Sequence, residues 1–122
     1  MIKINSSSSL CGQACLGTIL KCTLQQAINL IGHTHGTYTW EMARFFDTEF
    51  NEPTRGIPNK YSLCRVNFKN IGISHWVLYK KGKIYDPTIG DWLRLKDWQD
   101  HFAEIIPYIT SYAEIKKIIV RF

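Results

Sequence analysis

The sequence predicts an α+β fold in which N-terminal helices pack on a small antiparallel β-sheet. In the first half of the chain, apolar residues recur at helical spacing, whereas from residue 62 onward short aromatic and aliphatic segments alternate with turn residues. The chain has 122 residues, 45% of them hydrophobic, which suits one packed domain. We therefore expect a single domain over residues 11–122, after a flexible lead-in over residues 1–10 that contains the run Ser6–Ser9.

The first half of the chain is expected to be helical. The first helix runs from Cys11 to Cys22 with Ser9 as its N-cap, because the apolar residues of this segment recur at helical spacing. The second helix runs from Leu24 to Ile31 and ends at Gly32. Thr39 is expected to cap a third helix, which carries Trp40, Ala43, Phe46 and Phe50.

The second half of the chain predicts strands and one more helix. The expected strands are Ser62 to Phe68, Ser74 to Tyr79 and Lys83 to Asp86. After the turn that follows, Asp97 to Ile105 predicts a short helix that stops before Pro107. Ser111 and Glu114 have the spacing of a capping box, which predicts a further helical turn, and Ile118 to Phe122 predicts a strand that closes the sheet.

The chain carries a formal net charge of +5 and has a sequence pI near 9.1. This moderate excess of basic residues suits a solvated surface, or attraction to RNA or to an acidic protein partner. No apolar run is long enough to span a bilayer, and Met1 to Asn5 lacks the apolar stretch of a secretory signal. We therefore expect no membrane partner and a cytoplasmic site of action, reached directly or as part of a larger secreted effector.

The cysteines are Cys11, Cys15, Cys22 and Cys64. Their spacing matches neither a zinc-binding pair nor a small disulfide scaffold, which favours reduced thiols. The alternative is a zinc site that combines two of the cysteines with His33 and His35. We expect the reduced thiols, with no metal and no cofactor.

Cys11 has the position that a reactive thiol needs. Only the thiolate is nucleophilic, and the unpaired N–H groups and the dipole at the start of a helix lower the pKa of a thiol from its ordinary ~8.5. Gly12 follows and leaves that side of the thiol open. Cys15, one helical turn later, is expected in the core, and it becomes the rival nucleophile if the helix begins later. A cysteine at a helix start can also be a small core residue.

The expected hairpin brings a histidine and an aspartate together. We expect a two-residue turn at Lys81 and Gly82. Val77 then faces Asp86, and His75 lies diagonally across from Asp86 on the same face of the sheet. The carboxylate can there orient the imidazole as a base for a thiol. An odd loop or a bulge would put the two side chains on opposite faces. The alternative interpretations are a structural histidine and a turn-forming aspartate.

Two segments resemble a known family. Cys11–Leu16 resembles the D-C-G-x-A-C/S-L signature of the bacteriocin-processing, double-glycine-leader peptidases. Ser74–Tyr79, with the later Tyr85–Pro87, resembles their G-H-hydrophobic strand and Asp-Pro. Papain-fold toxin domains at the C-terminal ends of bacterial polymorphic toxins have a similar Cys … His … Asp-Pro pattern. The resemblance implies a papain-like fold for residues 11–122.

The resemblance also implies roles for the site residues. Cys11 corresponds to the nucleophile, His75 to the general base and Asp86 to the residue that orients the base. The family's oxyanion-hole Gln lies six residues before the nucleophile, where this chain has Asn5, whose amide can donate the same hydrogen bond.

Several functions are consistent with these residues. The first is a papain-fold toxin domain that hydrolyses or deamidates a target inside rival bacteria and is neutralised by an immunity protein. The second is the same fold used to cleave RNA, with His75 as acid or base and basic residues on the phosphates. The others are a leader-peptide peptidase and a non-catalytic binding module. The candidate substrate-binding residues are Trp76, Trp92 and Lys81.

Overall fold

The computed structural model describes residues 2–46, 57–68, 71–102 and 105–115. Its N-terminal helices are α1 (Cys11–Leu20), α2 (Leu24–Ile31) and α3 (Thr39–Ala43). Its strands are β1 (Ser62–Phe68), β2 (Ile71–Lys80), β3 (Lys83–Asp86), β4 (Asp91–Arg94) and β5 (Pro107–Glu114), and helix α4 (Leu95–His101) lies between the last two. The α+β class and the N-terminal helices packed on an antiparallel sheet are confirmed.

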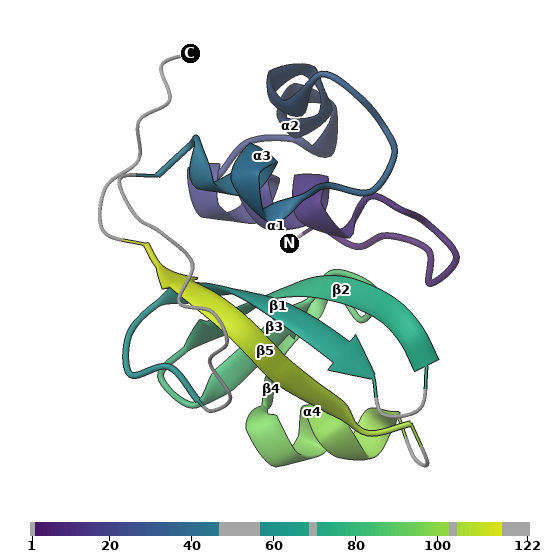
Figure 1. Cartoon of the computed structure of the whole chain (residues 1–122), viewed down its shortest axis with the longest axis vertical. Helices are drawn as coiled ribbons and strands as arrows, with labels where there is room; N and C mark the ends of the chain where they lie inside the picture. Colours follow the sequence, from purple (N-terminus) through teal and green to yellow (C-terminus); the bar gives the residue numbers. More distant parts are fainter. Residues whose placement is uncertain (1, 47–56, 69–70, 103–104, 116–122) are drawn as a thin grey trace.

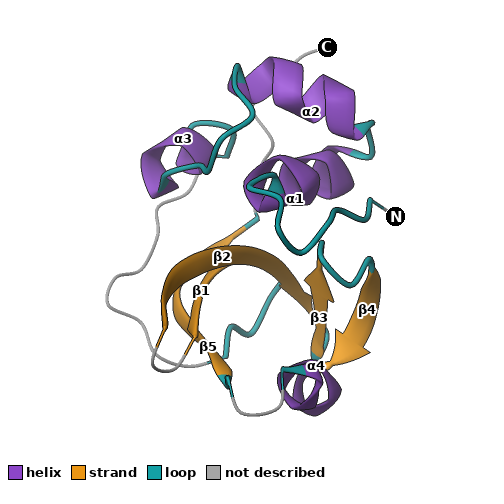
Figure 2. Ribbon diagram, turned by 90° about the vertical axis from the view of Figure 1, so that its right-hand side faces the viewer, coloured by secondary structure: helices purple, strands orange, loops and turns teal. Residues whose placement is uncertain are grey.

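The sheet has five strands in the order β4-β3-β2-β1-β5, and every neighbouring pair is antiparallel. Helices α1 to α3 lie on one side of the sheet and α4 lies on the opposite side (Figure 1). The strongly curved strand β2 runs directly beneath α1 (Figure 2). Both faces of the central strands are therefore covered, which explains why their sequences read as continuous apolar runs.

Two layers of apolar side chains stabilise this arrangement. The layer between the sheet and α1 to α3 includes Leu16, Leu63, Leu78 and Tyr85. The layer between the sheet and α4 includes Val66, Val77, Ile84 and Trp98. Full burial of an aliphatic side chain of this size contributes about 1.5–3 kcal/mol. In the described residues, no helix is long and apolar enough to cross a membrane.

The helices follow local capping signals. The Thr23 side chain accepts the N–H of Gln26, and the Gln26 side chain accepts the N–H of Thr23, so α2 begins with a capping box. Gly32 ends α2 in the left-handed conformation at φ 93°, as expected. Helix α1 ends before the expected Cys22, because Lys21 adopts the left-handed conformation at φ 56°.

Several residues of the segment before α1 contact the domain. Ile4 is 7% exposed, belongs to the core on the helix side and donates its N–H to the carbonyl of Pro87. Ser9 donates its hydroxyl to the carbonyl of Thr34 at 2.9 Å. The expectation that Ser9 caps α1 is therefore wrong, since its hydroxyl is used elsewhere and Leu10 occupies the cap position.

The segment after residue 90 differs most from the expectation. Helix α4 begins at Leu95 and ends at His101, earlier than the expected range at both ends. The helical turn expected from Ser111 and Glu114 is wrong, because both residues belong to β5, where buried positions alternate. Pairing of β5 with β1 decides the conformation here, although the local sequence favours a cap. The strand expected at Ile118 to Phe122 lies outside the described residues.

The β2–β3 hairpin has the expected register. Lys80 pairs with Lys83 and Tyr79 pairs with Ile84. Lys81 and Gly82 form the two-residue turn at φ 50° and 79°, which is the geometry of a type I′ turn. The turn fixes which side chains of β2 and β3 share a face of the sheet.

Replacing Lys81 in this turn is expected to stabilise the fold. An L-residue held in the left-handed region costs about 1–2 kcal/mol, and Asn tolerates it better than Lys. Lys81→Asn should therefore raise the free energy of unfolding by roughly 0.5–1 kcal/mol, and Gly82→Ala at φ 79° should lower it by about 1 kcal/mol. Urea unfolding measures both. Equal midpoints for the two variants would contradict this turn.

Candidate active site

Cys11, His75 and Asp86 lie together, although they come from three different elements. Cys11 is the first residue of α1, His75 lies on β2, and Asp86 is the last residue of β3. The Nε2 atom of His75 lies 2.7 Å from Oδ1 of Asp86, and Cys11 lies near enough to His75 for each of the two to shift the pKa of the other. The structure therefore brings together the three residues that the sequence indicated as a thiol site.

The imidazole of His75 is held between two partners. Because Nε2 donates to Asp86, Nδ1 is the ring nitrogen left for the Cys11 thiol. Burial lowers the pKa of His75, but the hydrogen bonds and charges of Asp86 and Cys11 more than offset it and raise this pKa to about 9. At neutral pH the imidazole is therefore protonated on both nitrogens.

The thiol of Cys11 is shifted in the opposite direction. Burial raises its pKa, but the hydrogen bond and charge of His75, with the backbone N–H groups of Trp76 and Gly12, bring the pKa below the ordinary value. Together with the raised pKa of His75, this favours a thiolate–imidazolium pair at neutral pH. Such a pair supplies both a charged nucleophile and a proton for a leaving group.

Asp86 is fully buried, and its hydrogen bonds compensate for that burial. Besides His75, its Oδ1 accepts the N–H of Thr88 at 3.0 Å and the hydroxyl of Thr88 at 2.8 Å. Its Oδ2 accepts the indole N–H of Trp98 at 3.0 Å. Burial raises the pKa of Asp86, but the contacts with His75, Trp98 and Thr88 lower it overall, so the carboxylate is ionised and fixed in direction.

Trp98 and Thr88 were missed as site residues by the sequence analysis. The Asp-x-Thr spacing of Asp86 and Thr88 is that of a side chain that bonds its own backbone two residues on, and it could have indicated Thr88. Trp98 had no such signal, because its contact with Asp86 depends on how α4 packs against the sheet.

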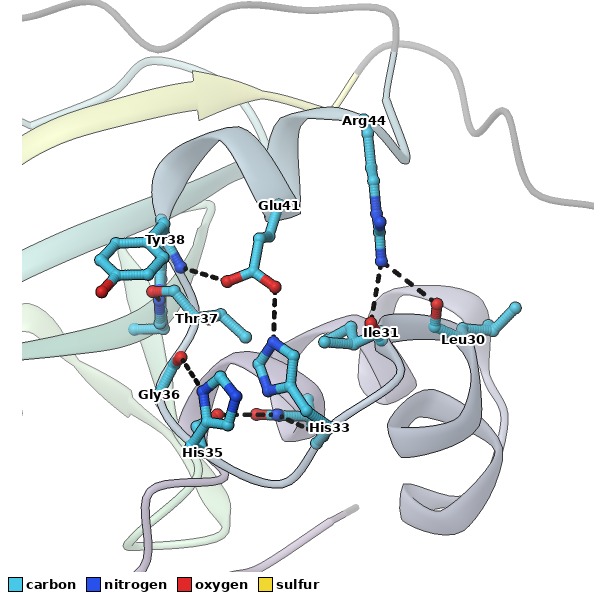
Figure 3. Close-up of polar contacts among 11 residues, drawn as sticks. Leu30, Ile31, His33, His35, Gly36, Thr37, Tyr38, Glu41 and Arg44 are labelled. Atoms are coloured by element: carbon cyan, nitrogen blue, oxygen red, sulfur yellow. Dashed lines mark hydrogen bonds and ion pairs between the residues drawn. The ribbon is translucent and has the colours of Figure 1, made fainter.

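Hydrogen bonds hold the loop between α2 and α3 in place beside the nucleophile. Gln13, buried on α1, donates its amide to the carbonyls of His33 and His35, both at 3.0 Å. The His33 ring contacts Glu41 at 2.5 Å, and the other oxygen of Glu41 accepts the N–H of Tyr38, as Figure 3 shows. The loop is therefore held from α1 on one side and from α3 on the other.

This loop lies directly against the residue that follows the nucleophile. A Cβ atom on Gly12 would stand 2.1 Å from the hydroxyl oxygen of Thr37, so only glycine fits there. The carbonyl of Thr37 accepts the indole N–H of Trp76 at 3.3 Å, which ties the loop to β2. The sequence suggested an open space beside Gly12, and this loop fills that space.

The histidines of the suggested zinc site have other contacts. The rings of His33 and His35 stack at 3.6 Å between centroids, and His33 pairs with Glu41. Within the described residues, no group of three or more potential metal ligands is close enough to hold a metal ion. Cys15 is fully buried, and burial, followed by the charges of Cys11 and Asp86, raises its pKa well above that of an ordinary thiol. Cys15 therefore fits the core position expected of it.

Two cavities adjoin Cys11. The larger has a volume of about 670 Å³, and its walls are formed by Ser6, Ser7, Ser8, Ser9, Cys11, Gly36, Phe68, Ser74, His75, Thr88, Phe102 and Ile105. The smaller has a volume of about 340 Å³, and its walls are formed by Cys11, His35, Gly36, Thr37, Tyr38, Arg65, Ser74 and Trp76. Cys11, which is 8% exposed, thus borders both cavities.

The other residues that the sequence indicated do not gather around Cys11. Asn5 is exposed and its Oδ1 accepts hydrogen bonds from Ser7, and it lines neither cavity. Trp92 packs against aromatic rings of the helix-side core. Lys81 lies at the hairpin turn, roughly 20 Å along the strand from His75. Trp76 is buried and lines the smaller cavity.

The sequence matches no protein-family model, and no curated protein matches it. What points to a thiol site is therefore the contact among Cys11, His75 and Asp86, together with the motifs around them.

The pH dependence of alkylation tests the thiolate directly. Iodoacetamide should modify Cys11 with a midpoint below the ordinary ~8.5, and His75→Ala should move that midpoint upward, because burial then acts with less opposition. Cys22 is the internal control, since partial burial raises its pKa. Mass spectrometry of the two cysteine peptides separates the rates. An alkylation midpoint for Cys11 at or above that of Cys22 would contradict a thiolate–imidazolium pair of Cys11 and His75.

Trp98→Phe tests how the carboxylate is held. Loss of a hydrogen bond to a buried charge should cost about 1.5–3 kcal/mol of unfolding free energy near neutral pH. The folded-state pKa of Asp86 is lowered, so its contribution is present above the unfolded pKa of ~3.9 and is lost as pH falls through the folded value. The difference in unfolding free energy between wild type and Trp98→Phe should therefore decrease as pH falls through the folded-state pKa of Asp86. Trp92→Phe is the control. If its unfolding free energy showed the same pH dependence as that of Trp98→Phe, Trp98 would not have the role of holding Asp86.

Proposed function

We propose that this chain is a cysteine hydrolase of papain-like fold that acts on amide or acyl bonds. The observation that carries the proposal is the contact among Cys11, His75 and Asp86, with the pKa of Cys11 lowered and that of His75 raised to about 9. A structural role for the three residues does not require these opposite shifts, whereas a nucleophile with its proton donor does.

The reaction follows from the positions of the protons. The Cys11 thiolate attacks the carbonyl carbon, and the carbonyl π electrons move to oxygen, which the backbone N–H of Cys11 stabilises. As the C–N bond breaks, Nδ1 of His75 gives its proton to the leaving nitrogen, and a thioester remains on Cys11. Water then attacks the thioester while Nδ1 takes its proton, and the acid and thiolate separate.

The distribution of charge favours amide substrates over RNA. The densest group of lysines, at positions 80, 81 and 83, surrounds the hairpin turn, roughly 20 Å from His75. The larger cavity instead has apolar walls at Phe68, Phe102 and Ile105. Strand cleavage by His75 would need several cations on the phosphates beside it, and of the described residues that line the two cavities Arg65 alone is a permanent cation.

The biological setting follows from the resemblance of the motifs to papain-fold toxin domains. In that setting the chain acts on a protein target in the cytoplasm of a rival bacterium, and an immunity protein covers the site in the producing cell. The excess of basic residues suits an acidic partner of this kind. A leader-peptide peptidase is the second candidate, since it uses the same three residues.

Growth of bacterial cells after induction tests this proposal. Wild type should arrest growth, and Cys11→Ala or His75→Ala should abolish the arrest, since loss of either group removes about 10³-fold or more of the activity of such a site. Cys22→Ala is the matched control and should arrest like wild type.

The other outcomes identify the rivals. Arrest that persists in Cys11→Ala, with degraded RNA, would replace the thiol mechanism by RNA cleavage. Absence of arrest in wild type, with a reactive Cys11, would favour the peptidase. Absence of both would leave a binding module.

A further inference from the structure

The smaller cavity beside Cys11 contains a guanidinium group that the proposed mechanism does not use. Arg65 lies in the middle of β1, half-buried, opposite Trp76 on β2. Its guanidinium carbon lies 5.2 Å from the centroid of the Trp76 ring. Arg65 and Cys11 both line this cavity of about 340 Å³, so whatever enters it meets the guanidinium and the thiol together.

Arg65 carries the permanent charge of this cavity. Of the described residues that line it, none is a carboxylate. Glu41 of α3, which holds the loop beside this cavity, is 5% exposed and already pairs with His33 and with the N–H of Tyr38. Among the ion pairs formed within residues 2–46, 57–68, 71–102 and 105–115, none involves Arg65.

A half-buried guanidinium of this kind favours an anion with matching geometry. Arginine presents planar N–H donors that bind a carboxylate through two parallel hydrogen bonds, and stacking on an aromatic ring holds the plane in position. Trp76 provides that ring, and its own indole is fixed by the carbonyl of Thr37. The orientation of the guanidinium is therefore prepared before a ligand arrives.

We propose that the Arg65 cavity binds a carboxylate of the substrate, the side chain of an Asp or Glu next to the bond that Cys11 cleaves. This inference rests on the proposed function and adds a substrate class to it. The two cavities meet at Cys11, so a peptide passing the thiol places an acidic residue at Arg65 and an apolar residue against Phe68, Phe102 and Ile105.

Alkylation of Cys11 by two reagents of the same shape tests the cavity without a substrate. Iodoacetate carries a carboxylate and iodoacetamide is neutral. In wild type, the ratio of the iodoacetate rate to the iodoacetamide rate should be about tenfold higher than in Arg65→Gln, with the iodoacetamide rate nearly unchanged. Arg65→Lys keeps the charge without the planar donors and should give an intermediate ratio.

The matched control is Lys81→Gln, which removes the same charge at the hairpin turn. At about 20 Å it lies beyond the screening length of ~8 Å at physiological salt, so its ratio should equal that of wild type. A ratio equal in wild type and Arg65→Gln would overturn the inference. If Cys11 then still reacts with a lowered midpoint, the proposed hydrolase survives; if Cys11 reacts like an ordinary thiol with both reagents, the proposed function fails as well.

Protection experiments identify the source of the carboxylate. N-acetylglutamate α-amide, which has only the side-chain carboxylate, should slow alkylation of Cys11 by iodoacetamide in wild type and not in Arg65→Gln. N-acetylglutamine, which has only the terminal carboxylate, should protect less; stronger protection by it would overturn the side-chain assignment. If inorganic phosphate alone protected Cys11 from alkylation, the cavity would not be a carboxylate site, and a nucleic acid would be favoured as its ligand.

Discussion

The buried hydrogen bond between His75 and Asp86 is the interaction on which the rest of the site depends. A carboxylate with no exposed surface costs several kcal/mol unless donors satisfy it. The donors come from β2, from the turn after β3 and from α4 on the far side of the sheet. The single carboxylate therefore ties three elements together, and helix α4 contributes its donor, Trp98, on the face of the sheet that carries His75 and Asp86.

The nucleophile is positioned by a second set of contacts that is independent of the first. Gln13 holds the loop after α2 by two carbonyl groups, and Thr37 fills the space that the side chain of any other residue at position 12 would need. Trp76 links the same loop to β2, the strand that carries His75. The loop thus fixes the separation between the helix that bears the thiol and the strand that bears the base.

The parts of this structure that sequence predicts are those set by neighbouring residues. The pairing of His75 with Asp86 follows from the parity of a two-residue turn, so the hairpin and the contact were both predictable. Ser111 shows the opposite case, because its capping signal is overridden by pairing with β1, far away in sequence. Trp98 and Arg65 likewise derive their roles from packing across the sheet, which no local spacing encodes.

The thiolate–imidazolium pair has a consequence for proton binding. Where the pair forms between about pH 6.5 and 8.5, the proton that the unfolded chain holds on Cys11 is held on His75 in the folded chain. Equal proton uptake makes the contribution of the pair to stability independent of pH in this range. The lowered pKa of Cys11 changes the stability of the fold only as pH falls through the folded-state pKa of the thiol. The raised pKa of His75 changes it only as pH rises through about 9. The thiolate–imidazolium pair therefore adds no pH dependence to the stability of the fold at neutral pH.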